Sequence, residues 1–376
     1  MGLTNYRLGD LIERRSERNT DLKYGIDDVR GISGEKYLMA TKADLTERDL
    51  STFRVVRPND FAFNRRTSRM GGKWCIAYNE TDKNIICTED NVVFSIKRTD
   101  LLLVEYLFMY INRSEFDRRV RFLSWGSASE FFNWEDMCDI VIPVPPAAIQ
   151  RKYVRVYLAM KANLRAYESG NDDLRLVCDM MLEKLKHTNP KIAIGTFIQQ
   201  TDIRNTDNQK FPFKGLSMDN YFIDSIANDT GLDFSAYKIV RPGDFGCVLM
   251  KIGWDCKLTI AQNISDTNYL ISPAYYSFSL SGINPLYFMG CVSRHEFERH
   301  AWFMCDTSTR GSLSWQEFCR MEIPDANDKE QQTIANIYIT AKKRKSIAER
   351  LKSIIKSACP VLIKGTIDEA RKDDSN

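Results

Sequence analysis

The sequence predicts an α+β protein: two similar mixed α/β domains with two long antiparallel coiled-coil helices between them, arranged as a tandem repeat with pseudo-twofold symmetry. Three observations carry this prediction. The chain repeats itself after about 180 residues, each copy begins with short apolar runs bounded by turn residues, and each copy ends in a long heptad pattern. The chain has 376 residues, with 43% apolar and 27% charged residues, which suits a globular protein of two or three domains.

The repeat is defined by five sequence matches that occur in the same order in both halves. The segment 9–21 resembles 195–207, at a separation of 186 positions. The other matches are 53–61 with 237–245, 114–118 with 295–299, 134–137 with 315–318, and 142–143 with 323–324. The separation falls slowly to 181 positions, as expected when two copies of one unit differ by short insertions.

We expect four segments along the chain. They are a first domain at 1–146, a first spacer helix at 147–189, a second domain at 190–324, and a second spacer helix with a C-terminal tail at 325–376. Within the first domain, short apolar runs such as 53–56 and 91–96 predict strands, and 101–120 predicts a helix.

The heptad pattern is the clearest structural signal. In the first spacer, apolar and aromatic residues recur at spacings of four and three: Tyr153, Tyr157, Met160, Leu164, Tyr167, Asn171, Leu174, Cys178, Met181 and Leu185. In the second spacer the corresponding residues are Ala341, Arg344, Ala348, Leu351, Ile355 and Ala358. One helix leads away from the first domain and the other leads back, so the two are expected to pair antiparallel.

The end of the second spacer carries two further expectations. Pro360 should end the helix, because proline lacks an N–H and clashes with the preceding turn. The segment 360–367 resembles 190–197, so a third copy of the repeat is expected to begin there and stop. In an antiparallel pair of helices, that tail lies beside the first domain, where we expect it to dock; the alternative is a frayed end.

The charge and cysteine content limit the possible classes of protein. A net charge of +3 means that any nucleic-acid binding must depend on local patches rather than on bulk charge. The ten cysteines include no Cys-x-x-Cys pair, which predicts free thiols and no metal site. The N-terminal region has Glu13, Arg14 and Arg15 where a signal peptide would be apolar, and no run is long enough to span a membrane. We therefore expect a cytoplasmic protein.

Both copies contain two loops in which basic, hydroxyl and aromatic residues alternate. Between Arg65 and Lys73 there are four basic residues and no acidic residue. Arginine and hydroxyl side chains bind phosphate oxygens, and arginine also reads guanine edges. The candidate DNA-binding residues are Arg65, Arg66, Thr67, Ser68, Arg69, Lys73 and Ser127 in the first copy, and Lys251, Trp254, Lys257, Thr309, Arg310 and Ser312 in the second.

Patterns that would indicate an enzyme are weak. Asn284-Pro285-Leu286-Tyr287 resembles an adenine-methyltransferase signature, but it lacks the second proline and no glycine-rich cofactor loop is found. Asp244 with Asp255-Cys256-Lys257 resembles a nuclease pattern, but the first copy has no matching carboxylate. We predict no catalytic residue. A nuclease or methyltransferase with an unrecognised site, and a two-headed protein-interaction scaffold, stay open as alternatives.

Taken together, the layout resembles the specificity (S) subunit of type I restriction-modification enzymes. The resemblance covers nearly the whole chain and depends on the duplicated pattern Gly-Asp-Leu-Ile (9–12), Val-Arg-Pro-x-Asp-Phe (56–61) and Ile-Pro (142–143). It also includes the glutamine at each helix start, Gln150 and Gln331. The family's Pro-Pro-x-x-Glu-Gln helix entry is altered, since the first copy lacks the glutamate and the second lacks the prolines.

The resemblance implies a reader of double-stranded DNA without activity of its own. Each domain would be a target recognition domain for one half of a bipartite target, and the helices would set the gap between the halves. Two adenine-methyltransferase (modification) subunits would dock on the chain, and restriction (motor-nuclease) subunits would join through them. S-adenosylmethionine, ATP and Mg would belong to those partners. Because the loops 64–73 and 248–257 share almost nothing, the two half-sites are expected to differ.

Overall fold

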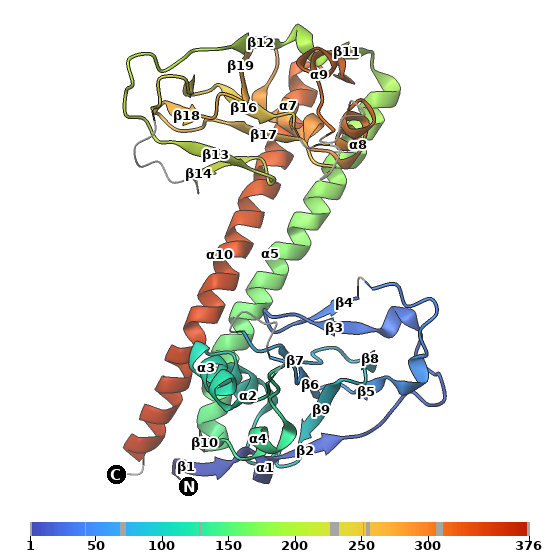
Figure 1. Cartoon of the computed structure of the whole chain (residues 1–376), viewed down its shortest axis with the longest axis vertical. Helices are drawn as coiled ribbons and strands as arrows, with labels where there is room; N and C mark the ends of the chain where they lie inside the picture. Colours follow the sequence, from blue (N-terminus) through green and yellow to red (C-terminus); the bar gives the residue numbers. More distant parts are fainter. Residues whose placement is uncertain are drawn as a thin grey trace. The chain divides into compact units, whose positions relative to one another are not determined.

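The computed structural model describes residues 2–41, 43–67, 73–127, 129–225, 233–250, 252, 256–305 and 311–373. The chain divides into two compact units, one formed by residues 1–165 with 348–376 and the other by 166–347. Each unit holds one mixed domain and one part of each long helix (Figure 1). The units are described one at a time.

The first unit is built on a four-stranded antiparallel sheet in the order β2-β9-β6-β7. These strands are β2 (Ile12–Arg15), β9 (Asn91–Ile96), β6 (Phe61–Asn64) and β7 (Ile76–Tyr78). The two-stranded sheets pair β1 (Thr4–Arg7) with β10 (Val141–Val144), β3 (Arg30–Ile32) with β4 (Leu38–Ala40), and β5 (Arg54–Val56) with β8 (Ile85–Cys87). The short helices are α1 (Leu8–Leu11), η1 (Ile26–Asp28), η2 (Leu50–Thr52), α2 (Val104–Ile111), α3 (Ser114–Leu123) and α4 (Trp134–Cys138).

The core of this unit lies between the four-stranded sheet and its helices. Every residue of β9 is buried, including the polar Asn91 and Ser95, which explains why its Val92-Val93-Phe94 run is apolar rather than alternating. Phe61 stacks on Phe94 with ring centroids 4.9 Å apart, and Trp74 packs edge-on against Phe132. Burial of these large aromatic rings supplies the main stabilising term of the domain.

The second unit repeats this topology strand for strand. Its four-stranded sheet has the order β12-β19-β16-β17, formed by β12 (Ile198–Thr201), β19 (Tyr276–Leu280), β16 (Phe245–Val248) and β17 (Thr259–Gln262). The two-stranded sheets pair β11 (Lys191–Ala193) with β20 (Glu322–Pro324), β13 (Lys214–Ser217) with β14 (Tyr221–Asp224), and β15 (Lys238–Val240) with β18 (Tyr269–Ile271). Its short helices are η3 (Ile194–Thr196), α7 (Pro285–Val292), α8 (His295–Phe303) and α9 (Trp315–Arg320).

A glycine of the repeated motif is required by the same close contact in both units. A Cβ at Gly9 would lie 2.9 Å from the Cβ of Cys138, and a Cβ at Gly195 would lie 2.8 Å from the carbonyl oxygen of Cys319. Only glycine lets the start of each domain approach its last short helix so closely. The glycine in the repeated motif therefore reflects packing of the domain.

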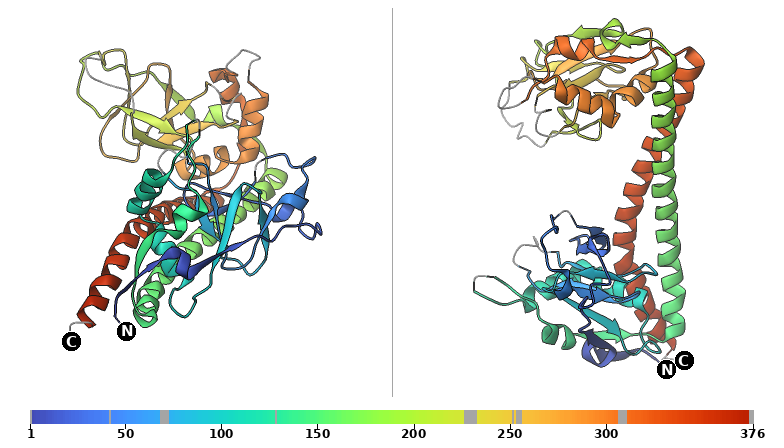
Figure 2. Two further views of the ribbon diagram at one scale, coloured as in Figure 1. Left: turned by 60° about the horizontal axis from the view of Figure 1, so that its bottom comes forward. Right: turned by 90° about the vertical axis from the view of Figure 1, so that its right-hand side faces the viewer.

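Helices α5 (Ala147–Thr188) and α10 (Asp328–Asp373) pair antiparallel within each unit, where they lie side by side (Figure 2). In the first unit Lys152 forms an ion pair with Glu369, at 2.8 Å. In the second unit the Arg344 guanidinium donates to the Ala166 carbonyl at 2.9 Å and lies over the Tyr167 ring. All the predicted seam residues of both helices are buried or half-buried.

The glutamine near the start of each long helix connects that helix to its domain. Gln150 is fully buried; its amide donates to the carbonyls of Leu101 and Pro145, and its oxygen accepts from the Leu103 amide. Gln331 accepts from the Asn284 amide and donates to the Ala326 carbonyl in the same way. These residues therefore join helix and domain in both units.

Two sequence predictions about helices are wrong. The expected helix at 101–120 is two helices, α2 and α3, because the chain turns at Asn112 and Arg113. Pro360 does not end the second long helix, since α10 continues through it to Asp373. Proline removes one N–H from the helix, and burial of the residues that follow offsets this loss.

The C-terminal tail has a different counterpart from the one its sequence suggests. It resembles 190–197, which forms β11 and η3, but the tail is helical. Its buried residues Cys359, Ile363 and Thr366 correspond instead to Cys178, Leu182 and Leu185 of α5, each 181 positions earlier and also buried. The tail docks in the first unit, where Ile363 joins the main hydrophobic core. It completes that domain as the end of α5 completes the second.

Candidate nucleic-acid interface

The two basic loops that the sequence suggests in the first copy form one structure. The Phe132 amide donates to the Arg65 carbonyl at 2.8 Å, and the Thr67 amide donates to the Glu130 carbonyl at 2.9 Å. Trp125 and Phe131 exchange backbone hydrogen bonds of 3.1 and 2.9 Å, which closes the second loop as a hairpin. Arg65 and Ser127, predicted from separate loops, therefore lie at one site.

Arg65 is the residue best placed to contact an anion. Its side chain is exposed and makes no hydrogen bond or ion pair with any residue that the structure describes. It lines an open hollow of about 570 Å³. The rest of this lining is Trp125, Gly126, Ser127, Ser129, Phe131 and Asn133. The hollow thus combines an exposed guanidinium, hydroxyl groups and an exposed indole, which suits phosphate and base edges.

Arg66 and Thr67 have a different environment from Arg65. The Arg66 guanidinium donates to the Ser129 hydroxyl at 2.7 Å, and its backbone amide donates to the Asn64 side chain at 2.9 Å. The Arg66 Nε atom and the Thr67 hydroxyl are buried and have no hydrogen-bond partner among the described residues. These contacts hold the two loops together, so Arg66 supports the shape of the site.

Several predicted site residues lie outside the described part of the chain. They are Ser68, Arg69, Lys251, Trp254, Thr309 and Arg310. Of the described candidates in the second copy, Ser312 is half-buried and next to Leu313, whose amide donates to the Leu249 carbonyl at 2.9 Å. The same loop pairing therefore occurs in both units, with buried Leu249 at the position of exposed Arg65.

Lys73 and Lys257 occupy equivalent positions and both form ion pairs. Lys73 pairs with Glu35, and Lys257 pairs with Glu298 at 2.8 Å. The Glu298 side chain is only 2% exposed, so the Lys257 ammonium neutralises a buried carboxylate. Neither lysine is free, which the local sequence could not reveal because the carboxylates are far away along the chain.

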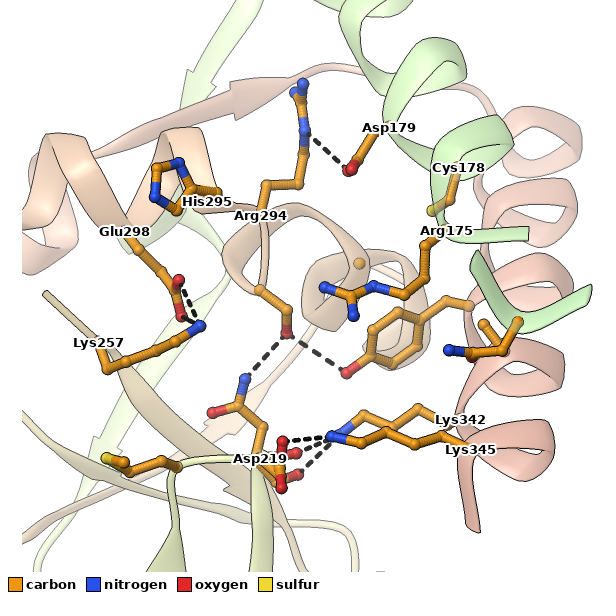
Figure 3. Close-up of a pocket in the computed structure, with 17 residues that line it drawn as sticks. Arg175, Cys178, Asp179, Asp219, Lys257, Arg294, His295, Glu298, Lys342 and Lys345 are labelled. Atoms are coloured by element: carbon orange, nitrogen blue, oxygen red, sulfur yellow. Dashed lines mark hydrogen bonds and ion pairs between the residues drawn. The ribbon is translucent and has the colours of Figure 1, made fainter. Parts of the chain in front are cut away.

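Lys257 also lines a hollow of about 180 Å³ in the second unit (Figure 3). Its three carboxylates are all paired with cations: Glu298 with Lys257, Asp179 with Arg294, and Asp219 with Lys345. The Asp179 pair joins the domain to α5 and the Asp219 pair joins it to α10, whereas the Glu298 pair lies within the domain. Every carboxylate of the described lining has a basic partner.

No protein-family model matches the chain, and no curated protein matches it either. Solved structures do match over nearly its full length. The S subunit of the type I restriction-modification system from M. genitalium aligns with a TM-score of 0.58 at 13% identity, covering 97% of this chain and 96% of that one. The HsdS subunit from Thermoanaerobacter tengcongensis (17% identity, 98% and 96% coverage) and a chain from a structure on assembly of the type I R-M system (15%, 98% and 97%) have TM-scores of 0.37 and 0.41.

The fold is that of a type I S subunit. The predicted fold class, with its two similar mixed domains and two long antiparallel helices, is thereby confirmed. Within this S-subunit fold the two units differ in chemistry at the position where their loops meet, which holds Arg65 in one and Leu249 in the other.

The residues that suggested an enzyme have structural roles in this S-subunit fold. The Asn284 side chain caps α7 by accepting from the Leu286 amide at 2.9 Å, and the Tyr287 hydroxyl donates to the Pro324 carbonyl. Asp244 lies in the turn before β16, where burial raises the pKa of its carboxyl. In the part of the chain that the structure describes, no three His, Cys, Asp or Glu side chains could together hold a metal ion. None of the helices described there is long and apolar enough to cross a bilayer.

Sequence reasoning missed part of the positive surface around Arg65. Burial lowers the pKa of Arg54, and the positive charges of Arg14, Arg18 and Arg65 lower it further, so each of these three arginines lies near Arg54. They lie on separate strands and turns, which are brought together only by the fold.

Proposed function

We propose that this chain is the sequence-specific DNA recognition subunit of a type I restriction-modification complex. Each domain reads one half of a bipartite target. The observation that carries this proposal is the paired-loop site of the first unit, where the exposed side chain of Arg65 lies beside Ser127 and the exposed Trp125. Its location on an S-subunit fold supports a DNA-reading role.

The difference between the two loop sites supports an asymmetric target. Arg65 is charged and exposed, whereas Leu249 at the equivalent position is apolar and 2% exposed. Two domains that share a fold but carry different side chains at the contact position are expected to bind different half-sites. The two long helices set the constant gap between these halves.

The long helices also dock two adenine-methyltransferase subunits, and restriction subunits join through these. Exposed apolar side chains on the helices support this part of the proposal. Met180 of α5 is 64% exposed in the second unit, and Val361 at the equivalent place on α10 is 70% exposed in the first. Apolar side chains that recur at one place in a repeat suit two copies of one partner.

In this proposal the chain performs no catalysis. S-adenosylmethionine, ATP and Mg act in the partner subunits, and the complex works in the cytoplasm. The rival proposals are a nuclease or methyltransferase with an unrecognised site and a protein-interaction scaffold.

One binding experiment separates these alternatives. The chain is assembled with its methyltransferase partner and titrated with a random pool of duplexes, and the bound fraction is sequenced. We expect salt-dependent binding that enriches one split motif. Cleavage or methyl transfer by the isolated chain would favour the enzyme, and absence of any DNA enrichment would favour the scaffold.

A further inference from the structure

The last turns of α3 in the first unit expose an aromatic ring beside exposed arginines. Phe122 is 87% exposed and makes no ring contact with any described residue. Arg118 lies four positions earlier, on the same face of the helix. The side chains of Arg118 and Arg121 are exposed and form no hydrogen bond or ion pair within the described ranges.

The second unit carries the same pair at the end of α8. Phe303 is 80% exposed and lies 181 positions after Phe122. Arg299 stands four positions before it, is exposed, and is also unpaired among the residues that the structure describes. Trp302, next to Phe303, is 48% exposed. An Arg–Phe pair at the same place in both domains is therefore part of the repeat.

This recurrence needs an explanation that a single exposed residue would not. Isolated exposed apolar residues are common on protein surfaces. Here, however, the ring and its arginine recur together, while the loops that follow them differ in chemistry. A feature shared by two domains that read different sequences must contact something that does not depend on sequence.

The charge of this surface indicates what that ligand is. The segments 118–123 and 299–303 contain no acidic residue, and each leads directly into a loop of the candidate DNA site. Arg119 is held by the Val141 carbonyl, which leaves Arg118 and Arg121 to bind an outside anion. Phosphates of duplex DNA match these cations, and an adjacent apolar ring matches a base step, as in proteins that insert apolar wedges.

We propose that the pairs Arg118–Phe122 and Arg299–Phe303 bind the DNA backbone and insert a phenyl ring against a base step in each half of the target. This inference rests on the proposed DNA-reading function and deepens it. The arginine holds a phosphate, and the ring partly unstacks the neighbouring bases. Both contacts are independent of base identity, so they strengthen binding and distort the duplex without choosing the sequence.

The test uses the chain assembled with its methyltransferase partner and duplexes that carry the motif enriched above. A 2-aminopurine is placed at successive positions, since its fluorescence rises when the base unstacks. Phe122→Ala should lower affinity about tenfold for all sequences alike and abolish the fluorescence rise in one half-site. Phe303→Ala should do the same in the other half-site, and Phe122→Trp should restore both signals.

The matched control is Ile264→Ala. Ile264 is 89% exposed, but its counterpart in the first unit, Glu80, pairs with Lys161 and Arg165 of α5, away from the loops. This variant should leave affinity and fluorescence unchanged. Because all these side chains are exposed, the thermal unfolding midpoints should match that of the wild type.

Two results would overturn the inference while leaving the DNA-reading function intact. One is sequence-selective binding by Phe122→Ala with unchanged affinity and fluorescence. The other is weaker assembly of Phe122→Ala with the methyltransferase and unchanged DNA parameters once assembled, which would make the ring a protein contact. Failure of the wild-type complex to bind DNA selectively would overturn the proposed function itself.

Discussion

Lys36 and Asp117 form a buried ion pair in the first unit, with 2.6 Å between the Lys36 ammonium and the Asp117 carboxylate. The two side chains are 4% and 13% exposed. The ammonium also donates to the Ile111 carbonyl at 2.7 Å, at the end of α2. Burial lowers the pKa of Lys36, and the Asp117 charge opposes that shift.

In the second unit, the cation that pairs with the equivalent carboxylate comes from a different position in the repeat. Glu298, the counterpart of Asp117, pairs with Lys257, while Asn220 stands at the position of Lys36. Asn220 donates to the Ser293 hydroxyl instead. The two domains therefore pair an equivalent buried carboxylate with lysines from different positions, although they keep the same fold.

Lys36→Met should destabilise the first unit by about 3–5 kcal/mol, because it leaves the Asp117 carboxylate buried without its cation. Adding Asp117→Asn should recover most of the loss. The free energy of unfolding of each variant is measured by chemical denaturation, and amide hydrogen exchange shows whether the loss of stability lies in the first unit. Lys73→Met is the control, since that side chain is half exposed and its loss should cost less than about 1 kcal/mol. Equal costs for Lys36→Met and Lys73→Met would contradict this account.

Glu183 predicts a pH dependence in the second unit. The Arg294 guanidinium holds the pKa of this carboxyl down at about 2. A lowered pKa in the folded state means that the stabilisation is complete above about pH 4.5 and is lost as the pH falls toward 2. Glu183→Gln should therefore be less stable than the wild type at pH 7, by under about 1 kcal/mol because the side chain is 41% exposed. The gap should close between pH 4.5 and 2; a gap that stays constant over this range would refute the assignment.

The tail of α10 is predicted to be part of the first domain's core. Ile363→Ala should cost about 2–5 kcal/mol, because the side chain is fully buried and its removal leaves a cavity. Val361→Ala, two residues away and 70% exposed, should have almost no effect. Hydrogen exchange should rise in the first unit and stay unchanged in the second. An Ile363→Ala chain as stable as Val361→Ala would mean that the tail does not complete the domain.

Arg65→Ala should weaken DNA binding by about 1–3 kcal/mol if the guanidinium reads a base, and relax choice only in one half-site. If it binds phosphate, affinity should fall for all sequences and the salt slope should decrease by about one. Arg48→Ala removes the same charge where Arg48 is paired with Glu89, and it should alter neither quantity. Binding by Arg65→Ala that is indistinguishable from the wild type would exclude this loop from the interface.

The repeat and the heptad seam could be predicted from the sequence because both are periodic. Short matches such as Gly9 with Gly195 mark places where backbone must approach closely in each copy. Pro360 misled the prediction because a local helix breaker was outweighed by burial of Cys359 and Ile363 on either side. The tail corresponds to the end of α5, because its buried residues recur 181 positions after those of α5. The similarity of its sequence to 190–197 does not reflect its structure.

The site was only partly predictable. Arg65 was found because basic residues gather in one loop, and Ser127 because a second loop had the same composition. The partners of Lys73 and Lys257 lie 38 and 41 positions away along the chain, so nothing in the residues around these lysines indicates that their ammonium groups are paired with carboxylates. Phe122 and Phe303 were missed because a helical phenylalanine usually predicts core, and only the structure shows that both rings are exposed.

Mapping of methylated adenines across the genome of the source organism, with the gene present and deleted, tests the central claim most directly. If the chain is the DNA reader of a type I complex, deletion removes one motif made of two different half-sites at a constant gap. Arg65→Ala should then change the bases or the extent of methylation without changing that gap. Methylation that is unaffected by the deletion, or a lost motif that is continuous rather than split, would contradict the account.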